Sequence, residues 1–330
     1  MVQTPNSTSN PTPSQRLFRL LNTERRDIGY VYLYAIVAGL IGLSLPLGIQ
    51  AVFNLVSGGM VFSSVYVLIG LVIVGVIISG FILIGQQVLV EVLQQRLFVK
   101  AAFEFTYRLP RIEPEAFNGH YPPELMNRFF DVLTIQKGLP KLLIDITAAV
   151  VQIGLGIILL SFYHPVFIAF GIVTILTVVG IVWLNGPKAL KTSLNESKYK
   201  YKLVAWLETM AGQLPTIRQA TEPAAYMNQT DELVAQYITY RNQHFSVLKR
   251  FYISAVAFKT LITGGLLILG TTLVVGREMT LGQFVAAELV IVLITSSVDK
   301  LIMGIDVVYD LMTAVEKLGT VTDLPLSDER

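Results

Sequence analysis

Charged side chains inside long apolar segments are the residues of this chain best placed to do chemistry. Asp145, Lys259 and Asp299 lie at similar depths in three such segments, near the inner edge expected for a bilayer. A charge at that depth is costly unless it is paired or hydrated. We therefore predict an intramembrane ion pair in which Asp299 or Asp145 neutralises Lys259. A position on a substrate pathway is the alternative for Lys259.

Two further polar residues lie within the apolar segments. Glu288 is in the outer half of the sixth segment, where Arg277 is the only cation at a comparable depth. We expect Glu288 to line a cavity, because an unpaired acid in hydrocarbon is otherwise costly. Gln152, in the middle of the third segment, suits an interhelical hydrogen bond and a ligand contact equally well.

Several kinds of site are excluded by the sequence. The chain contains no cysteine, which rules out disulfides, thiolate metal sites and cysteine nucleophiles. It also contains no Gly-x-x-x-x-Gly-Lys-Ser/Thr phosphate loop, so it has no site for ATP hydrolysis. We identify no catalytic residue, no metal ligand and no cofactor of the chain itself, and we expect no nucleic-acid partner.

The elements that must position these residues are apolar helices. Hydrophobic residues make up 53% of the 330 residues and charged residues only 15%, which is unlike a water-soluble domain. Six apolar runs approach the ~20 residues needed to cross a hydrocarbon core ~30 Å thick. They are about 31–53, 65–88, 142–161, 166–184, 253–275 and 282–303. The sequence predicts an all-α membrane protein with six transmembrane helices.

The distribution of positive charge orients these spans. Of the 25 Lys and Arg residues, all but Lys259 and Arg277 fall on one side of the six-span arrangement. Lys and Arg concentrate in cytoplasmic loops. We therefore expect both termini in the cytoplasm and the chain in the cytoplasmic (inner) membrane of a bacterial cell. Residues 1–15 are rich in Pro, Ser, Thr and Asn and are expected to form a disordered tail.

Two long inner connections, 89–141 and 185–252, are predicted to form helical hairpins. Val88–Arg108 contains no Gly or Pro, so the second span should continue as one helix far beyond the membrane. The fourth and fifth spans extend in the same way. Proline disfavours helix in the residue before it, and each hairpin is interrupted near its tip, at Pro110 and Pro123 and at Gly212 and Pro215. Each tip should carry a short transverse element.

These hairpins, together with local motifs, resemble the transmembrane domain of ABC exporters. The similar segments are Glu124–Arg128 with Asp131 and Val132, Glu208–Arg218, Thr280–Ala286, and the tail Ala314–Pro325. They correspond to the family's Gly-Glu-Leu-x-x-Arg…Asp-Val segment, its Glu-x-x-x-Gly segment, its entry into the sixth helix and its approach to the ATPase domain. The resemblance covers the chain from about Gln15 to Pro325.

Some positions depart from the family pattern. Pro123 replaces the usual Gly, and Ser297 stands where the family often has Pro, so hairpin stiffness is expected to differ. Leu55–Met60 mimics the ABC signature loop, but the charge distribution places it in an outer turn, away from ATP. Small residues in a tight turn explain it better.

The resemblance implies the membrane-spanning subunit of an ATP-driven exporter, which forms the substrate pathway by alternating access. It divides the chain into an interfacial elbow helix at 16–26, the transmembrane domain at 27–316 and a linker toward an ATPase domain at 317–330. The sequence ends at Arg330, where that domain begins in the family. We therefore expect the domain on a separate subunit, or lost by truncation, with ATP and Mg²⁺ bound there.

The resemblance also implies partners and contact residues. A second copy of the domain, identical or related, should pair with this one in the bilayer. In the family the tips of the hairpins dock into grooves of the ATPase domains and transmit their closure. Carried over to this sequence, the coupling residues are Pro114, Glu115, Ala116, Phe117 and Asn118 at the first tip, and Gly212, Gln213, Leu214, Pro215 and Thr216 at the second.

Two other functions stay open on the sequence. A non-transporting or regulatory scaffold could use the same fold, and a secondary transporter would work without nucleotide. The hairpins and the family motifs argue against a secondary transporter. The substrate is left open among peptides, proteins, lipids and drugs.

The charge distribution makes a topological prediction. Single cysteines placed at Ser57 and at Ser197 should fall on opposite sides of the membrane, because they lie in an outer turn and in an inner hairpin. In intact cells, an impermeant maleimide should label position 57 and not position 197. The reverse pattern would invert the topology and remove the exporter interpretation.

Overall fold

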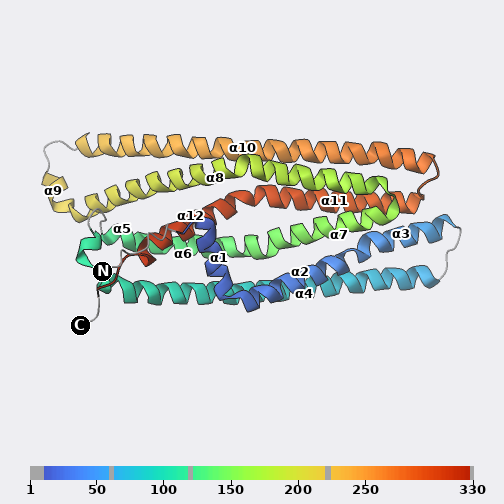
Figure 1. Ribbon diagram of the computed structural model, residues 1–330, viewed down its shortest axis with the longest axis horizontal. Coiled ribbons are helices and arrows are strands. Elements are labelled where there is room, and N and C mark those ends of the chain that lie inside the picture. Colours follow the sequence, from blue (N-terminus) through green and yellow to red (C-terminus); the bar gives the residue numbers. More distant parts are fainter. Residues whose placement is uncertain (1–10, 59–62, 118–121, 220–223, 328–330) are drawn as a thin grey trace, which may run out of the picture.

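The computed structural model describes residues 11–58, 63–117, 122–219 and 224–327. Within these residues the chain is an elongated bundle of helices (Figure 1). The long elements are α2 (Arg25–Gly42), α3 (Ser44–Ser57), α4 (Ser63–Arg108), α7 (Thr147–Tyr163), α8 (Val166–Gly212), α10 (Ala224–Val275), α11 (Leu281–Met303) and α12 (Ile305–Thr322). The short ones are α1 (Pro13–Thr23), η1 (Leu109–Arg111), η2 (Pro114–Phe117), α5 (Pro122–Asn127), η3 (Arg128–Phe130), α6 (Asp131–Pro140), η4 (Lys141–Ile146) and α9 (Leu214–Gln219).

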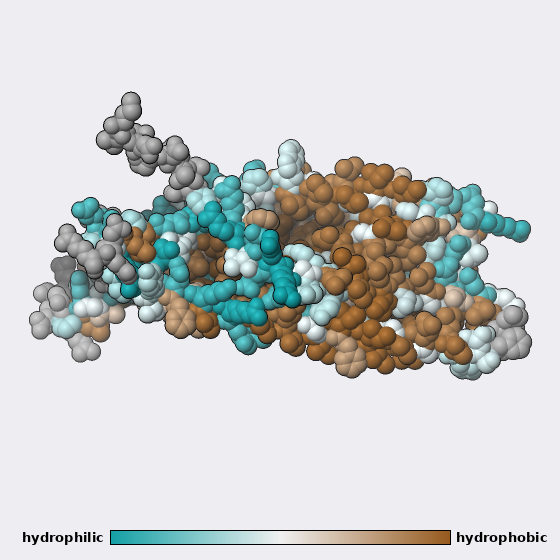
Figure 2. All heavy atoms as spheres, turned by 60° about the horizontal axis from the view of Figure 1, so that its bottom comes forward, coloured by the Kyte–Doolittle hydropathy of each residue, from teal (hydrophilic) through white to brown (hydrophobic). Residues whose placement is uncertain are grey.

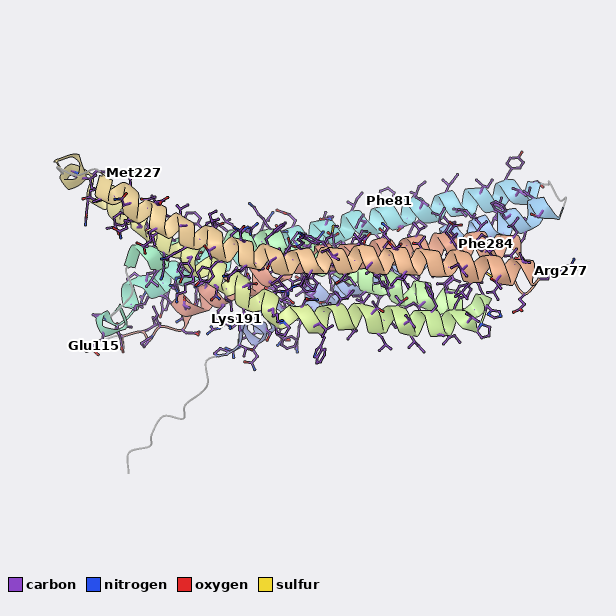
Figure 3. The ribbon with its side chains drawn as sticks, turned by 90° about the horizontal axis from the view of Figure 1, so that it is seen from above. Phe81, Glu115, Lys191, Met227, Arg277 and Phe284 are labelled. Atoms are coloured by element: carbon purple, nitrogen blue, oxygen red, sulfur yellow. The ribbon has the colours of Figure 1, made fainter. Side chains whose placement is uncertain are left out.

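On the face shown in Figure 2, apolar side chains form a belt across one part of the bundle. Six helical stretches in the described residues are long and apolar enough to cross a membrane. Side chains such as Val67 and Phe81 on α4 are largely exposed, and Figure 3 shows Phe81 pointing away from the bundle. Exposed apolar surface of this extent requires a lipid or protein environment. The fold class predicted from the sequence, all-α with six transmembrane helices, is confirmed.

The sixth span is at the centre of the bundle and the second is at its edge. Half of the most apolar window of α11 and α12 is buried, whereas none of the corresponding window of α4 is. Small residues bring α11 close to its neighbours. A Cβ on Gly156 of α7 would lie 2.9 Å from Ile294, and one on Gly270 of α10 would lie 2.6 Å from the ring of Phe284. These approaches are typical of membrane helices.

Two of the spans expected as single helices are interrupted at prolines. The first divides between α2 and α3 at Leu43, just before Pro46. The third consists of α5, η3, α6, the π-helix η4 and α7, and Pro140 ends α6 where the π turn begins. Proline has no N–H, and its ring crowds the carbonyl four residues earlier. The helical hydrogen-bond ladder is therefore broken at both places.

The helical hairpins extend far beyond the apolar belt. At 1.5 Å per residue, α4 alone is roughly 70 Å long over its 46 residues. Figure 3 shows the two tips apart, with Glu115 on one and Met227 near the other. The long helix α8 is not straight: it contains Pro187 and changes direction near Lys191 (Figure 3).

The N-terminal helix α1 begins earlier than expected. The composition of residues 1–15 predicts a disordered tail, but Pro13, Ser14 and Gln15 form the first turn of α1. The reason is a capping box, in which Thr12 accepts from the Gln15 backbone and the Gln15 side chain accepts from the Thr12 backbone. At the other end of the chain, α12 continues to Thr322. The expected linker, 317–330, therefore starts within a helix.

One arginine fastens these two terminal regions together. Arg16 of α1 lies 3.0 Å from Glu316 Oε2 through Nε and 2.6 Å from Asp323 Oδ2 through Nη2. The hydrogen bond to Asp323 raises the pKa of Arg16 above its ordinary value, against the cost of burial. The guanidinium lies over Gly319, where a Cβ would come within 2.1 Å of Nη1. We call this contact the Arg16 clamp.

The Arg16 clamp predicts a steric coupling between Arg16 and Gly319. Gly319→Ala should destabilise the protein by about 1–3 kcal/mol, since the added methyl group displaces a buried guanidinium. Adding Arg16→Ala should relieve the clash, so the double variant should melt no lower than Arg16→Ala alone. Thermal unfolding in detergent measures both effects. Arg19→Gln, a charge change on the exposed side of α1, is the control. Strictly additive losses would show that no clash exists.

Candidate functional site

The first hairpin tip is formed by the short helices η1 and η2. Pro114 and Glu115 are exposed and Ala116 is half-buried. The turn is held by the Ala116 N–H, which donates to the Glu113 carbonyl over 2.9 Å. The side chain of Phe117 and the whole of Asn118 lie outside the described residues. The structure therefore presents a proline and a carboxylate at the surface of this tip.

The second tip is formed by the end of α8 and by α9. Gly212, Gln213, Leu214 and Pro215 are all exposed, and the Gln213 N–H donates to the carbonyls of Thr209 and Met210 at 3.1 Å each. The chain turns between Gly212 and Leu214, and Pro215 lies in the first turn of α9. Proline fits a first helical turn because no N–H is needed there. The side chain of Thr216 lies outside the described residues.

The C-terminal segment is attached to the base of the first tip. Ile112 forms an antiparallel bridge with Leu326. The Glu113 N–H donates to the Pro325 carbonyl over 3.2 Å, and the Ser327 N–H donates to the Arg111 carbonyl over 2.8 Å. Ile112 is 4% exposed, so the pairing has an apolar anchor. Residues 325–327 and 111–113 therefore form one unit, which we call the C-terminal strap.

A buried polar junction connects both hairpins with α12. Asn127 of the first hairpin donates to Glu208 of the second, and Arg128 donates to Thr320 of α12. Tyr201 of α8 donates to Asp131 Oδ2 over 2.5 Å. Burial raises the pKa of Asp131, which lies in the polar extension outside the apolar spans, although the Tyr201 hydrogen bond and three nearby cations oppose the shift.

This junction gives a physical role to the motifs seen in the sequence. Arg128 of η3, Asp131 of α6 and Glu208 of α8 belong to the two segments with family resemblance, and all three take part in the buried junction. Hydrogen bonds of charged groups are stronger than neutral ones when buried. These hydrogen bonds connect both hairpins to α12, which follows α11 directly after Gly304.

The polar residues within the apolar spans separate into distinct pairs. Lys259 Nζ of α10 lies 3.1 Å from Asp299 Oδ2 of α11. Asp145 is not brought to Lys259, because its Oδ2 lies 3.2 Å from Lys141 Nζ on the same helix. The sequence predicts Asp299 or Asp145 as the partner of Lys259. In the structure Asp299 pairs with Lys259, and Asp145 pairs with Lys141.

Gln152 and Glu288 differ in their surroundings. Gln152 Oε1 of α7 accepts a hydrogen bond from Ser297 Oγ of α11 over 2.8 Å, and Ser297 is fully buried. Of the two roles considered for Gln152, this geometry favours interhelical bonding. Glu288 is exposed on α11, and no ion pair is seen for it among the described residues. It therefore faces lipid, a cavity or a second chain.

Sequence reasoning missed two buried polar contacts. Gln86 of α4 is 2% exposed and donates to the Val31 carbonyl of α2 over 2.9 Å. His244 of α10 is equally buried and its Nδ1 lies 2.9 Å from Thr192 Oγ1 of α8. A polar residue on an otherwise apolar helix face is the signal that could have identified Gln86. Nothing in the sequence shows that His244 faces α8.

The Lys259–Asp299 pair predicts non-additive stability. On insertion scales, a lone charge in a membrane helix costs up to about 2.5–3.5 kcal/mol, the value at the helix centre. Lys259→Met and Asp299→Asn should each lower the melting temperature and yield of detergent-solubilised protein, and the double variant should recover most of the loss. Lys259→Met with Asp145→Asn should show no recovery, because Asp145 pairs with Lys141. Equal behaviour of the two double variants would contradict the pairing.

The chain was compared with models of known protein families and with curated proteins. The search of curated proteins found no match. The family model described as the ABC transporter transmembrane region matches residues 28–298. The match takes in nearly all of the first five membrane-spanning stretches, the sixth as far as residue 298, and both hairpins, and it ends before Thr320 of the buried junction. The chain is a member of the ABC transporter transmembrane-region family.

Proposed function

We propose that this protein is the membrane-spanning subunit of an ATP-driven exporter in the inner membrane of a bacterium, with both termini in the cytoplasm. It forms the pathway for the substrate and is driven by ATPase domains that bind the hairpin tips. The observation that carries the proposal is the buried junction, which joins both tips to the helix that continues the central span.

The tips are suited to dock against another domain. They lie at the same end of the bundle (Figure 1), and each exposes short, differently shaped elements at the end of a long helical hairpin. Helices resist bending except at proline, glycine or irregular turns. A displacement at the first tip is therefore carried along α4 toward the membrane. At the second tip, part of it can be absorbed at Pro187 of α8.

The C-terminal strap supports a second connection to the same tip. In this proposal an ATPase domain lies beyond or beside residue 327. The strap holds residues 325–327, which lead toward that domain, against residues 111–113 at the base of the first tip. The first tip and the last described residues would then move together when the ATPase domains close. ATP and Mg²⁺ bind on those domains, because this sequence has no phosphate loop.

A second transmembrane chain completes the proposed transporter. The most apolar window of α4 has no buried residue, and Glu288 of α11 is exposed within an apolar span. An exposed acid in hydrocarbon is expensive, whereas one facing a watered cavity is not. Pairing two chains around such a cavity would cover part of α4 and hydrate Glu288. Glu288 is then a candidate contact for substrate, with Lys259 and Gln152 held by their partners.

The proposal predicts which protein lies against the tips. A photoreactive phenylalanine analogue placed at Glu115 or at Gln213, both exposed, should crosslink in cells to a protein carrying an ABC-type ATPase domain. The same analogue at Ser57, exposed at the opposite end of the bundle, is the control and should capture none. Mass spectrometry identifies the adducts. Tips that capture no ATPase domain while Ser57 does would reverse the proposed orientation.

In the maleimide test, Lys198 is a better position than Ser197 for the cysteine in the inner hairpin. Ser197 is 7% exposed, so a cysteine there could be unreactive even on the accessible side. Lys198, its neighbour, is exposed and reports the same hairpin.

A further inference from the structure

A cavity lies under the N-terminal helix, apart from the hairpin tips and the intramembrane pairs. Its volume is about 380 Å³, within the range of small-molecule sites, which is roughly 300–1,000 Å³. Leu20 and Leu21 of α1 form one wall, Leu93 and Leu97 of α4 another, and Leu139 of α6 and Leu318 of α12 close it. We call it the elbow cavity.

The lining of the elbow cavity favours an alkyl chain. All of its apolar side chains are aliphatic, and no aromatic ring lines it in the part of the chain that the structure describes. Flat aromatic ligands are usually held by aromatic side chains, which stack on them. Flexible leucine side chains fit a flexible methylene chain. Ala101, at 7% exposure, gives the cavity part of its width because its side chain is small.

A polar pocket of about 470 Å³ adjoins the elbow cavity, and the two share Thr23 and Glu24. Arg25, Arg26 and Arg96 line it, together with Asp27 and Tyr30. An alkyl chain in one compartment would place its head in the other. The two compartments together therefore match an amphiphile.

The charges around the shared boundary favour an anionic head. Arg96 already neutralises both nearby acids, lying 3.3 Å from Glu24 and 2.6 Å from Asp27, and Lys100 also contacts Glu24. Glu104, which also lines the cavity, pairs with Arg108. Arg25 and Arg26 are exposed and form no ion pair within the described residues. Two cations are thus left to bind a carboxylate or phosphate.

We propose that the elbow cavity binds a single-chain anionic amphiphile, with its alkyl chain among the leucines and its head against Arg25 and Arg26. The ligand would fill the space between α1, α4 and α12, next to the Arg16 clamp. The proposal does not depend on the export function, because both compartments belong to one chain.

Photolabelling of the full chain in nanodiscs of zwitterionic phospholipid tests the site. The probe is a palmitate analogue with a diazirine near the end of its chain, and peptide mass spectrometry locates the adducts. We expect saturable labelling of the cavity walls in residues 93–104 and 318–322. Labelling confined to lipid-exposed residues 67–84 would overturn the proposal, because it would show partition into the bilayer alone.

Competition distinguishes the head groups. Unlabelled palmitate and hexadecyl phosphate should both reduce labelling of the cavity walls, and the stronger competitor identifies the preferred anion. Hexadecyltrimethylammonium, with the same chain and a positive head, should compete poorly, and inorganic phosphate should not compete. Equal competition by the cationic amphiphile would refute the role of Arg25 and Arg26.

Substitutions test the polar pocket and the elbow cavity separately. Arg25→Gln with Arg26→Gln should raise the probe concentration for half-maximal labelling about tenfold, a loss of ~1.4 kcal/mol. Arg19→Gln, on α1 but lining neither compartment, is the matched control and should have no effect. Ala101→Met should block labelling by filling the cavity, and Leu97→Phe serves the same purpose if Ala101→Met fails to fold. Unchanged labelling in folded cavity variants would exclude the site.

Discussion

Hydrocarbon offers no hydrogen-bonding partner to a peptide group, and this constraint shapes the whole molecule. Every backbone N–H and C=O within a membrane must be satisfied by the chain itself, which a helix achieves locally. The described residues accordingly form long helices, and no strand pairing occurs within the apolar spans in the described part. Three of these helices extend far past the apolar belt: α4 ends at Arg108, just before Leu109-Pro110, α8 ends at Gly212, and α10 is also far longer than a span needs.

The places where this regularity fails are where the molecule can bend or connect. Pro46, Pro140 and Pro187 interrupt or deflect the first, third and fourth spans. Gly304 separates the central span α11 from α12, its extension toward the hairpins. In the buried junction, Arg128 and Tyr201 then tie α12 and α8 to the first hairpin. The long helices resist bending, and these few positions are where bending is least opposed.

Both ends of the chain are fastened by contacts that involve α12 or the residues directly after it. The Arg16 clamp holds α1 against the last turns of α12, and the C-terminal strap holds the following residues against the base of the first tip. The elbow cavity lies between α1, α4 and α12, beside this route. A ligand bound at that position would affect the packing of the N-terminal helix and the C-terminal segment together, without contact with Glu288, Lys259 or Gln152.

Much of this architecture follows from the sequence alone. Spans, hairpins and helix breaks at Pro110 and Gly212 follow from apolar length, charge and proline, because each depends on local preferences or on transfer into lipid. The partner of Lys259 did not follow, since Asp145 and Asp299 lie at similar depths and only helix rotation separates them. Nor could the sequence show the Arg16 clamp, the C-terminal strap or the elbow cavity. These join residues hundreds of positions apart or lie between several helices, and only tertiary packing decides which side chains meet there.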